Sequence, residues 1–196
     1  MRYLVFIGFI LGLAWSLSGC ASLSKQQCVE GNWLEIGRQD GIAGMGMERF
    51  QEHIKACDSY GIHPNLALYK RGRDLGLKSY CDVQRQLNLG LSGERYRPVC
   101  SGPIARLLKR ANEWGYQGYR VKSGIHSSQQ QLDEVREKLR DKNIKKEEAE
   151  RLEGEEQRLL DEIDRLRLEL VRIKSGAEQD LTYRTNQFYK TRQKTH

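Results

Sequence analysis

The sequence GRQDGI at residues 37–42 recurs as GRDLGL at residues 72–77, so the chain contains one glycine motif twice. In both copies the glycines are four residues apart, and an aromatic residue, Trp33 or Tyr69, precedes the first glycine by about one helical turn. On an α-helix these positions share one face. A glycine inside a helix costs about 1 kcal/mol relative to alanine. We therefore expect a neighbouring helix to approach each glycine face closely.

Similar glycine and aromatic patterns follow further along the chain, and five short helices are expected around them. The alternative is a set of glycine turns between short strands. The expected helices cover about residues 31–44, 47–60, 65–81, 82–92 and 102–120. The residues that carry the structural pattern are Trp33, Gly37, Asp40, Gly41, Gly44, Tyr69, Gly72, Arg73, Gly76, Tyr80, Gly90, Gly93 and Tyr96.

Four cysteines, Cys28, Cys57, Cys81 and Cys100, lie within this glycine-rich part. An even number of cysteines predicts two disulfides if the chain reaches an oxidising compartment, and three pairings exist. If the first two helices form an antiparallel hairpin, Cys28 and Cys57 meet at one end. An extended stretch over residues 93–99 is long enough to bring Cys100 back to Cys81. We therefore favour Cys28 with Cys57 and Cys81 with Cys100.

A metal site is the alternative role for these cysteines, because His53 and Cys57 lie one helical turn apart and His63 and Cys81 follow in the sequence. Zinc accepts histidine and cysteine ligands. No pair of cysteines has the two-residue spacing that is typical of zinc sites, and export favours oxidation. We expect disulfides, with no metal and no cofactor.

After residue 124 the composition changes to charged residues and leucine, which indicates a helical arm. Apolar residues repeat at heptad spacing over 132–139 and again over 159–173, but the two series are out of register. The arm is therefore either a long helix with an interruption or a helical hairpin. We expect a mainly α fold in which a disulfide-pinned, glycine-rich helical domain at 20–124 precedes a charged arm at 125–175, a possible coiled coil, and a mobile basic tail at 176–196.

The chain begins with the features of a lipoprotein signal peptide, which we assign to residues 1–19. Arg2 supplies the positive charge, residues 4–15 form a short apolar run, and LSGC at residues 17–20 ends in the cysteine that would be acylated. The apolar run is shorter than the roughly 20 residues that span a bilayer. We expect Cys20 to be the lipidated first residue of the mature protein, with its acyl chains in the membrane.

Charge is distributed unevenly along the chain. Residues 20–124 contain 16 Lys and Arg against 10 Asp and Glu, whereas residues 125–175 are close to balance. Basic clusters, at Lys70, Arg71 and Arg73 and at Arg106, Lys109 and Arg110, could attract an anionic envelope polymer. More often such residues form a solvated helix face. No nucleic-acid recognition motif accompanies them, so nucleic acid is not an expected partner.

The order of glycines, aromatic residues and cysteines resembles bacterial lipoproteins that carry domain of unknown function 2799. The resemblance covers about residues 20–120 and includes the segments Trp33–Gly44, His53–Cys57, Tyr69–Cys81 and Gly90–Cys100. It implies no activity, because none is assigned to that family. The last motif is altered here to Trp114-Gly115-Tyr116, and residues 125–196 look like an addition to the family's core.

Three functions are compatible with these features. The first is a non-catalytic lipoprotein on the periplasmic face of the outer membrane, which binds an envelope protein or self-associates through residues 125–175. The second is a binder of anionic envelope polymers. The third is a metal-dependent envelope enzyme with His53, His63, Asp40 and Asp74 as candidates, but the chain lacks a nucleophile, metal or paired-carboxylate motif that would support it. We expect the protein not to be an enzyme.

Overall fold

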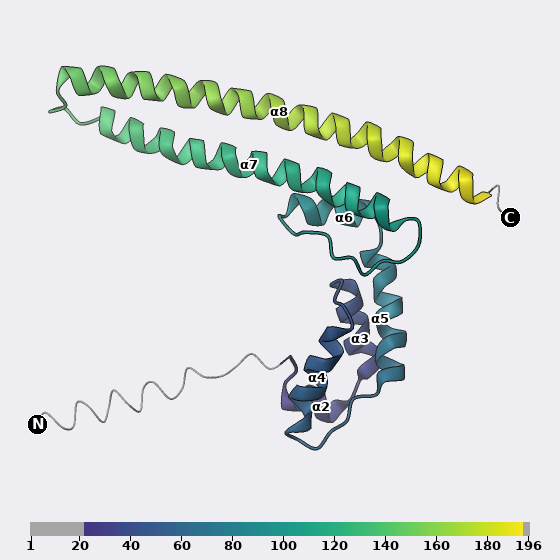
Figure 1. The fold of residues 1–196 in the computed structure, drawn as a ribbon. Helices are drawn as coiled ribbons and strands as arrows, with labels where there is room; N and C mark the ends of the chain where they lie inside the picture. The colour runs from purple at the N-terminus through teal and green to yellow at the C-terminus, as the bar shows by residue number, and fades with distance from the viewer. Residues whose placement is uncertain (1–21, 194–196) are drawn as a thin grey trace, which may run out of the picture. The chain divides into compact units, whose positions relative to one another are not determined.

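The computed structural model describes residues 22–193, and α-helix is the only regular secondary structure in that range. The mainly α fold is therefore confirmed, and the alternative of short strands is not seen among these residues. No helix within them has the length and apolar character needed to cross a membrane. The helices (Figure 1) are α2 (Lys25–Glu30), α3 (Trp33–Ile42), α4 (Glu48–Asp58), α5 (Leu66–Tyr80), α6 (Val83–Leu91), α7 (Ala105–Leu139) and α8 (Lys146–Gln193).

Helix boundaries follow local capping signals. The Ser24 side chain caps the short helix α2, which the glycine pattern did not predict, and Gly31 ends it with a φ of 59°. The first glycine helix is shorter than expected: α3 stops at Ile42, and Gly44 lies beyond it with a φ of 66°. Gly93, which has a φ of 89°, likewise lies beyond the end of α6. These two glycines serve turns and not helix faces.

The chain forms two compact units that divide between Ser79 and Tyr80. Unit 1 contains α2, α3, α4 and most of α5, and unit 2 contains α6, α7 and α8. This division corrects the expected domain boundary near residue 124. That position lies inside the uninterrupted helix α7. Gly124 does not end the helix but faces α8, where a Cβ on it would lie 3.4 Å from Cδ1 of Leu166.

In unit 1 the repeated glycine motif forms the contact between α3 and α5. A Cβ atom at Gly37 or Gly41 would overlap the backbone of α5 at Tyr69 or Arg73, and Cβ atoms at Gly72 and Gly76 would overlap the backbone of α3. At Gly41, the added atom would lie only 2.9 Å from the backbone nitrogen of Leu77. Both helices therefore need their glycines for the backbones to approach this closely.

The hydrophobic core of unit 1 surrounds the Cys28–Cys57 disulfide, which joins α2 to α4. Phe50 and Tyr69 pack in this core with their ring centroids 4.8 Å apart. Partly buried aliphatic side chains cover the cluster. The core residues are Leu23, Cys28, Trp33, Phe50, Cys57 and Tyr69.

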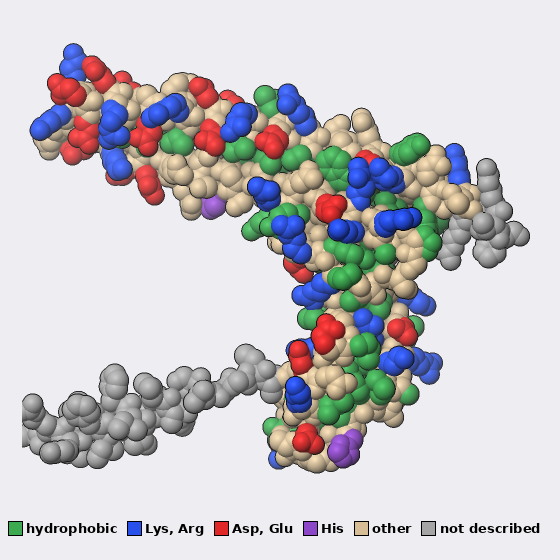
Figure 2. All heavy atoms as spheres, in the orientation of Figure 1, with side chains coloured by type: hydrophobic (Ala, Val, Ile, Leu, Met, Phe, Trp, Pro, Cys, Tyr) green, Lys and Arg blue, Asp and Glu red, His purple; other side chains and the backbone are tan. Residues whose placement is uncertain are grey.

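In unit 2, helices α7 and α8 form an antiparallel hairpin with its turn at residues 140–145. Figure 1 shows the two helices side by side along their lengths. The two apolar series are out of register because each belongs to a different arm of the hairpin, and they face one another: Leu132 and Val135 pack with Leu152, Leu159 and Ile163. Lys, Arg, Asp and Glu are interspersed on the surface of this hairpin in Figure 2.

The segment expected to be a mobile tail is largely helical. Helix α8 continues to Gln193, and within it Ala177 and Leu181 are buried, with Leu181 clustered with Leu107 and Ala111 of α7. Sequence composition did not reveal this because Ala177 and Leu181 are the only buried hydrophobic residues in the described part of the segment, 176–193. Residues 194–196 lie outside the described range.

Helix α6 packs on α7 through a second glycine contact. A Cβ at Gly90 would overlap the backbone of Asn112, and one at Gly115 would overlap that of Leu87. The Cys81–Cys100 disulfide closes the loop around α6, with a sequence separation of 19 residues. Both disulfides thus have the pairing that the sequence favours.

Candidate functional site

The most buried polar cluster of unit 1 is centred on His53 of α4, which is 1% exposed. Its Nε2 lies 2.8 Å from Oδ2 of Asp40 on α3, and its Nδ1 lies 2.8 Å from Oγ of Ser22. The hydroxyl of Tyr69 on α5 donates to the same Asp40 oxygen at 2.8 Å. The cluster therefore joins three helices to the segment that precedes α2.

One tautomer of His53 satisfies both hydrogen bonds of its ring. When His53 Nε2–H donates to the carboxylate of Asp40, Nδ1 accepts from the Ser22 hydroxyl. Burial, followed by the hydrogen bond to Asp40, raises the pKa of Tyr69 far above its usual value of 10.0. Tyr69 therefore remains a hydrogen-bond donor at physiological pH.

Ser22, His53 and Asp40 are the residue types of a hydrolase triad. A triad needs an imidazole that can pass a proton to a reacting substrate and donors that stabilise an oxyanion. Here the ring is almost fully buried, and the Asp40 oxygen also binds Tyr69. The residue that follows Ser22, Leu23, belongs to the core. We interpret the cluster as a structural network that docks residues 22–24 onto unit 1.

Arg73, of the second glycine motif, is also part of the interior. It is 9% exposed, and its Nε donates to the backbone oxygen of Met45 at 2.8 Å. This contact links α5 to the loop between α3 and α4. The arginines of the two motif copies thus have different roles. Arg38 on α3, which corresponds to Arg73, forms a local ion pair with Glu35.

A second polar network organises unit 2 around Asn112, which is 2% exposed. Its Nδ2 donates to the backbone oxygens of Gln86 and Glu94, and its Oδ1 accepts from the backbone N–H of Tyr96 at 2.8 Å. Tyr80 takes part nearby, because its hydroxyl accepts from the backbone N–H of Arg97. These contacts fix the loop after α6 against α7.

Asp180 joins the two arms of the hairpin close to α6. It accepts from Nε of Arg110 and from Nε1 of Trp114 on α7, and from Arg184 on its own helix. Burial alone would raise the pKa of Asp180, but these three hydrogen bonds outweigh burial and hold the pKa well below its usual value of 3.8. The carboxylate is therefore charged at physiological pH.

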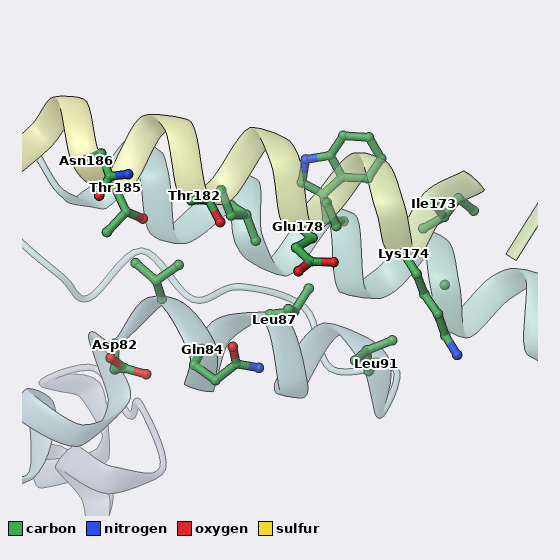
Figure 3. A pocket seen from close by; sticks show the side chains of 15 residues that line it. Asp82, Gln84, Leu87, Leu91, Ile173, Lys174, Glu178, Thr182, Thr185 and Asn186 are labelled. Carbon is green, nitrogen blue, oxygen red and sulfur yellow. The ribbon is translucent and has the colours of Figure 1, made fainter. Parts of the chain in front are cut away.

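A groove of about 630 Å³ lies between α6 and α8 in unit 2. Trp114 and Gly118 of α7 contribute to its lining, and Figure 3 shows Leu87 and Leu91 of α6 opposite side chains of α8 across the opening. Polar side chains on the edge include Asp82, Gln84, Lys174, Glu178, Thr182, Thr185 and Asn186. The apolar lining residues are Val83, Leu87, Leu91, Trp114, Gly118, Ile173, Ala177 and Leu181.

The groove was not predicted from sequence, because its walls come from helices about 90 residues apart. Its lining suits an apolar ligand, since most of the lining side chains from α6 and α7 are apolar and small residues, Gly118 and Ala177, leave room between the helices. Pockets of this volume and character typically bind apolar groups with a few polar contacts at the edge.

Of the four candidates for an enzyme, the structure brings together Asp40 and His53 and leaves His63 and Asp74 exposed on other elements. The cysteines of the zinc alternative, Cys57 and Cys81, are bonded to other cysteines. Within the described residues no group of three or more metal-ligating side chains forms.

The basic clusters are partly engaged in other contacts. Arg73 is buried, Arg110 pairs with Asp180, and Lys109 pairs with Glu113. Lys70 and Arg71 are exposed on α5. These contacts weaken the proposal of a continuous anion-binding helix face.

Comparison with known proteins finds one family match. Residues 32–118 match the family described as protein of unknown function (DUF2799), the family that the order of glycines, aromatic residues and cysteines resembles. The match covers α3 to α6 and the beginning of α7, so α8 lies outside it. No curated protein and no solved structure matches the chain.

Proposed function

We propose that this chain is a non-catalytic lipoprotein of the cell envelope, held on the periplasmic face of the outer membrane by acyl chains on Cys20, and that its second unit binds a helical partner. The observation that carries the proposal is the N-terminal sequence: one positive charge, a short apolar run and small residues end at Cys20. The other four cysteines of the sequence pair with one another in the two disulfides. Disulfides of this kind support an oxidising compartment.

Metabolic labelling tests the anchor. Radioactive palmitate should enter the wild-type protein, and Cys20→Ala should abolish the label and leave an uncleaved precursor. Ala21→Ser is the matched control, because it changes the neighbouring residue and keeps the thiol. Label in Cys20→Ala at the wild-type level would overturn the proposal.

Sorting to the outer membrane is tested at the next residue. In Gram-negative lipoproteins, the absence of Asp at the second mature position resembles the signal for outer-membrane delivery, and Ala21 occupies that position here. Ala21→Asp should move the labelled protein to the inner-membrane fraction, whereas Ala21→Ser should not. An unchanged distribution in both variants would contradict outer-membrane sorting through this residue.

The groove of unit 2 supports the choice of a helical partner. The seam of the hairpin is filled by its own residues, such as Leu132 and Ile163, and so is not open for self-association. The groove, in contrast, has an apolar lining between two helices that both pack on α7. One further amphipathic helix laid between α6 and α8 would bury that lining, as in helix-in-groove recognition.

Site-specific photocrosslinking in intact cells tests partner binding. A photoreactive residue at Thr182, which is exposed at the groove, should give a discrete adduct that a probe at Arg165 on the same helix does not give. Leu87→Glu should remove the adduct, because it places a charge on the opposite wall. The crosslinked peptide should contain an apolar helix face; an adduct that persists in Leu87→Glu would show that the groove is not the binding site.

A further inference from the structure

Ser22 and Leu23, the first described residues of the chain, have a fixed position on unit 1. Ser22 is hydrogen-bonded to the buried ring of His53, and Leu23 is 6% exposed within the core. Cys20 precedes Ser22 by two residues, and a chain of that length spans at most about 7 Å. The acyl chains proposed for Cys20 must therefore enter the membrane close to this docking point.

Helix α2, which follows the docked residues, and the turn after α4 carry side chains of the kinds that occur at membrane interfaces. Lys25 and Val29 are four residues apart on α2 and share its outer face, and Val29 is 64% exposed. Tyr60, just after α4, is 43% exposed, and its ring centroid lies 5.8 Å from Nζ of Lys25. We call Lys25, Val29 and Tyr60 the anchor-side patch.

The anchor-side patch is also held rigidly. The Cys28–Cys57 disulfide joins α2 to α4, and Val29 and Tyr60 lie one and three residues after its two cysteines. Glu30, the neighbouring carboxylate on α2, is hydrogen-bonded by Gln26 at 2.8 Å. An exposed apolar residue, a tyrosine and a lysine are thus held on two elements that a disulfide joins.

We propose that the anchor-side patch lies against the phospholipid headgroups of the membrane that holds the acyl chains, and that it sets the orientation of unit 1 on that membrane. Tyrosine favours the membrane–water interface, and lysine extends its ammonium group to lipid phosphates. A tether of two residues keeps the patch at high effective concentration next to the bilayer, so three side chains suffice. This inference rests on the proposed lipidation of Cys20.

Depth-sensitive quenching in the lipidated, full-length mature protein tests the orientation. A nitrobenzoxadiazole fluorophore would be attached at Val29→Cys after reconstitution into vesicles of phosphatidylethanolamine and phosphatidylglycerol that contain brominated lipid. The matched control is Asp74→Cys on α5, which lies midway between Gly72 and Gly76 and so points away from α3. Quenching at position 29 should exceed that at position 74 several-fold.

A second variant tests the patch itself. Lys25→Glu combined with Tyr60→Ser should reduce quenching at position 29 at least twofold while palmitate incorporation stays unchanged. Equal quenching at positions 29 and 74 in protein that carries palmitate would overturn the orientation and leave the anchor intact. Absence of palmitate from the wild-type protein would instead overturn the proposed function.

Discussion

At the scale of single residues, buried polar side chains decide how loops and helix ends are held. Asp40 accepts two hydrogen bonds on one carboxylate oxygen, and Asn112 makes three contacts with backbone groups. Asp40 was named among the residues of the structural pattern, whereas Asn112 and Asp180 were not. Nothing in their local sequence distinguishes them from exposed polar residues, because their partners lie far away in the chain.

Asp40→Ala should destabilise unit 1 by about 1–3 kcal/mol, because it leaves the buried donors of His53 and Tyr69 without an acceptor. The matched control is Asp74→Ala, which removes an exposed carboxylate and should change stability by less than about 0.5 kcal/mol. Urea unfolding of the mature chain without lipid measures both. Equal stabilities would show that the Asp40 network does not support the fold.

Asp180 should make the stability of unit 2 depend on pH in acid. The pKa of Asp180 is lowered in the folded protein. Its contribution to the stability of unit 2 is therefore present at pH values above its usual pKa of 3.8 and is lost as the pH falls below that value. Asp180→Asn should cost about 1 kcal/mol at pH 7, a modest value because the arginine partners are about half exposed. Chemical unfolding at pH 7 and pH 3 measures the effect. The difference in free energy of unfolding between wild type and variant should shrink at pH 3. A difference that is the same at both pH values would contradict the role of the Asp180 carboxylate.

At the scale of helices, glycine is required for close packing at some positions and makes no packing contact at another. In α3, α5, α6 and α7 it permits backbones to approach, whereas Gly154 in α8 has no atom within 4 Å of the position of a Cβ. Sequence spacing identified the first kind, since two glycines four residues apart form a face. It could not decide which helix packs on that face.

The same substitution should therefore have opposite effects at Gly41 and Gly154. Gly41→Ala places a methyl group against the backbone of Arg73 and Leu77 and should destabilise unit 1 by about 1–3 kcal/mol. Gly154→Ala should stabilise α8 by up to about 1 kcal/mol, because alanine is the better helix former and the space is open. Thermal melting of each variant gives the sign; a rise in both melting temperatures would show that the α3–α5 contact can open.

At the scale of the whole molecule, the chain divides at residue 79 and not where its composition changes. The glycine-rich composition continues through α6 and into α7, but these helices belong with α8 in unit 2. Helix α8 lies outside the matched family region and packs on α7, burying Leu181 beside Leu107. The addition to the family's region is thus part of a core.

Truncation after Gly124 should disrupt unit 2, because removing α8 exposes Leu107, Ala111 and Trp114 of α7. Unit 1 should remain folded, since its core and its disulfide lie before Tyr80. Limited proteolysis followed by mass spectrometry measures this, with cleavage expected in residues 81–124 and protection of residues 22–79. Protection of both segments would restore a boundary near residue 124.

Unit 1 should fold by itself. A chain of residues 21–80 keeps α2 to α5, the Cys28–Cys57 bond and the glycine contact between α3 and α5. It should show a cooperative thermal transition by circular dichroism that disappears or shifts well down on reduction, because a disulfide contributes roughly 2–5 kcal/mol in a small domain. A non-cooperative melt of the oxidised chain would mean that unit 1 depends on unit 2.

The sequence by itself determined the helical class, the helices α3 to α6 and the start of α7 to within a few residues, the family region and the disulfide pairing. These depend on periodicity, capping residues and chain lengths between cysteines, which are local properties. Only the tertiary structure decided the division at Ser79, the hairpin, the extent of α8 and the groove between α6 and α8. Each of these depends on which distant apolar faces bury one another, and a single helix face does not specify its partner.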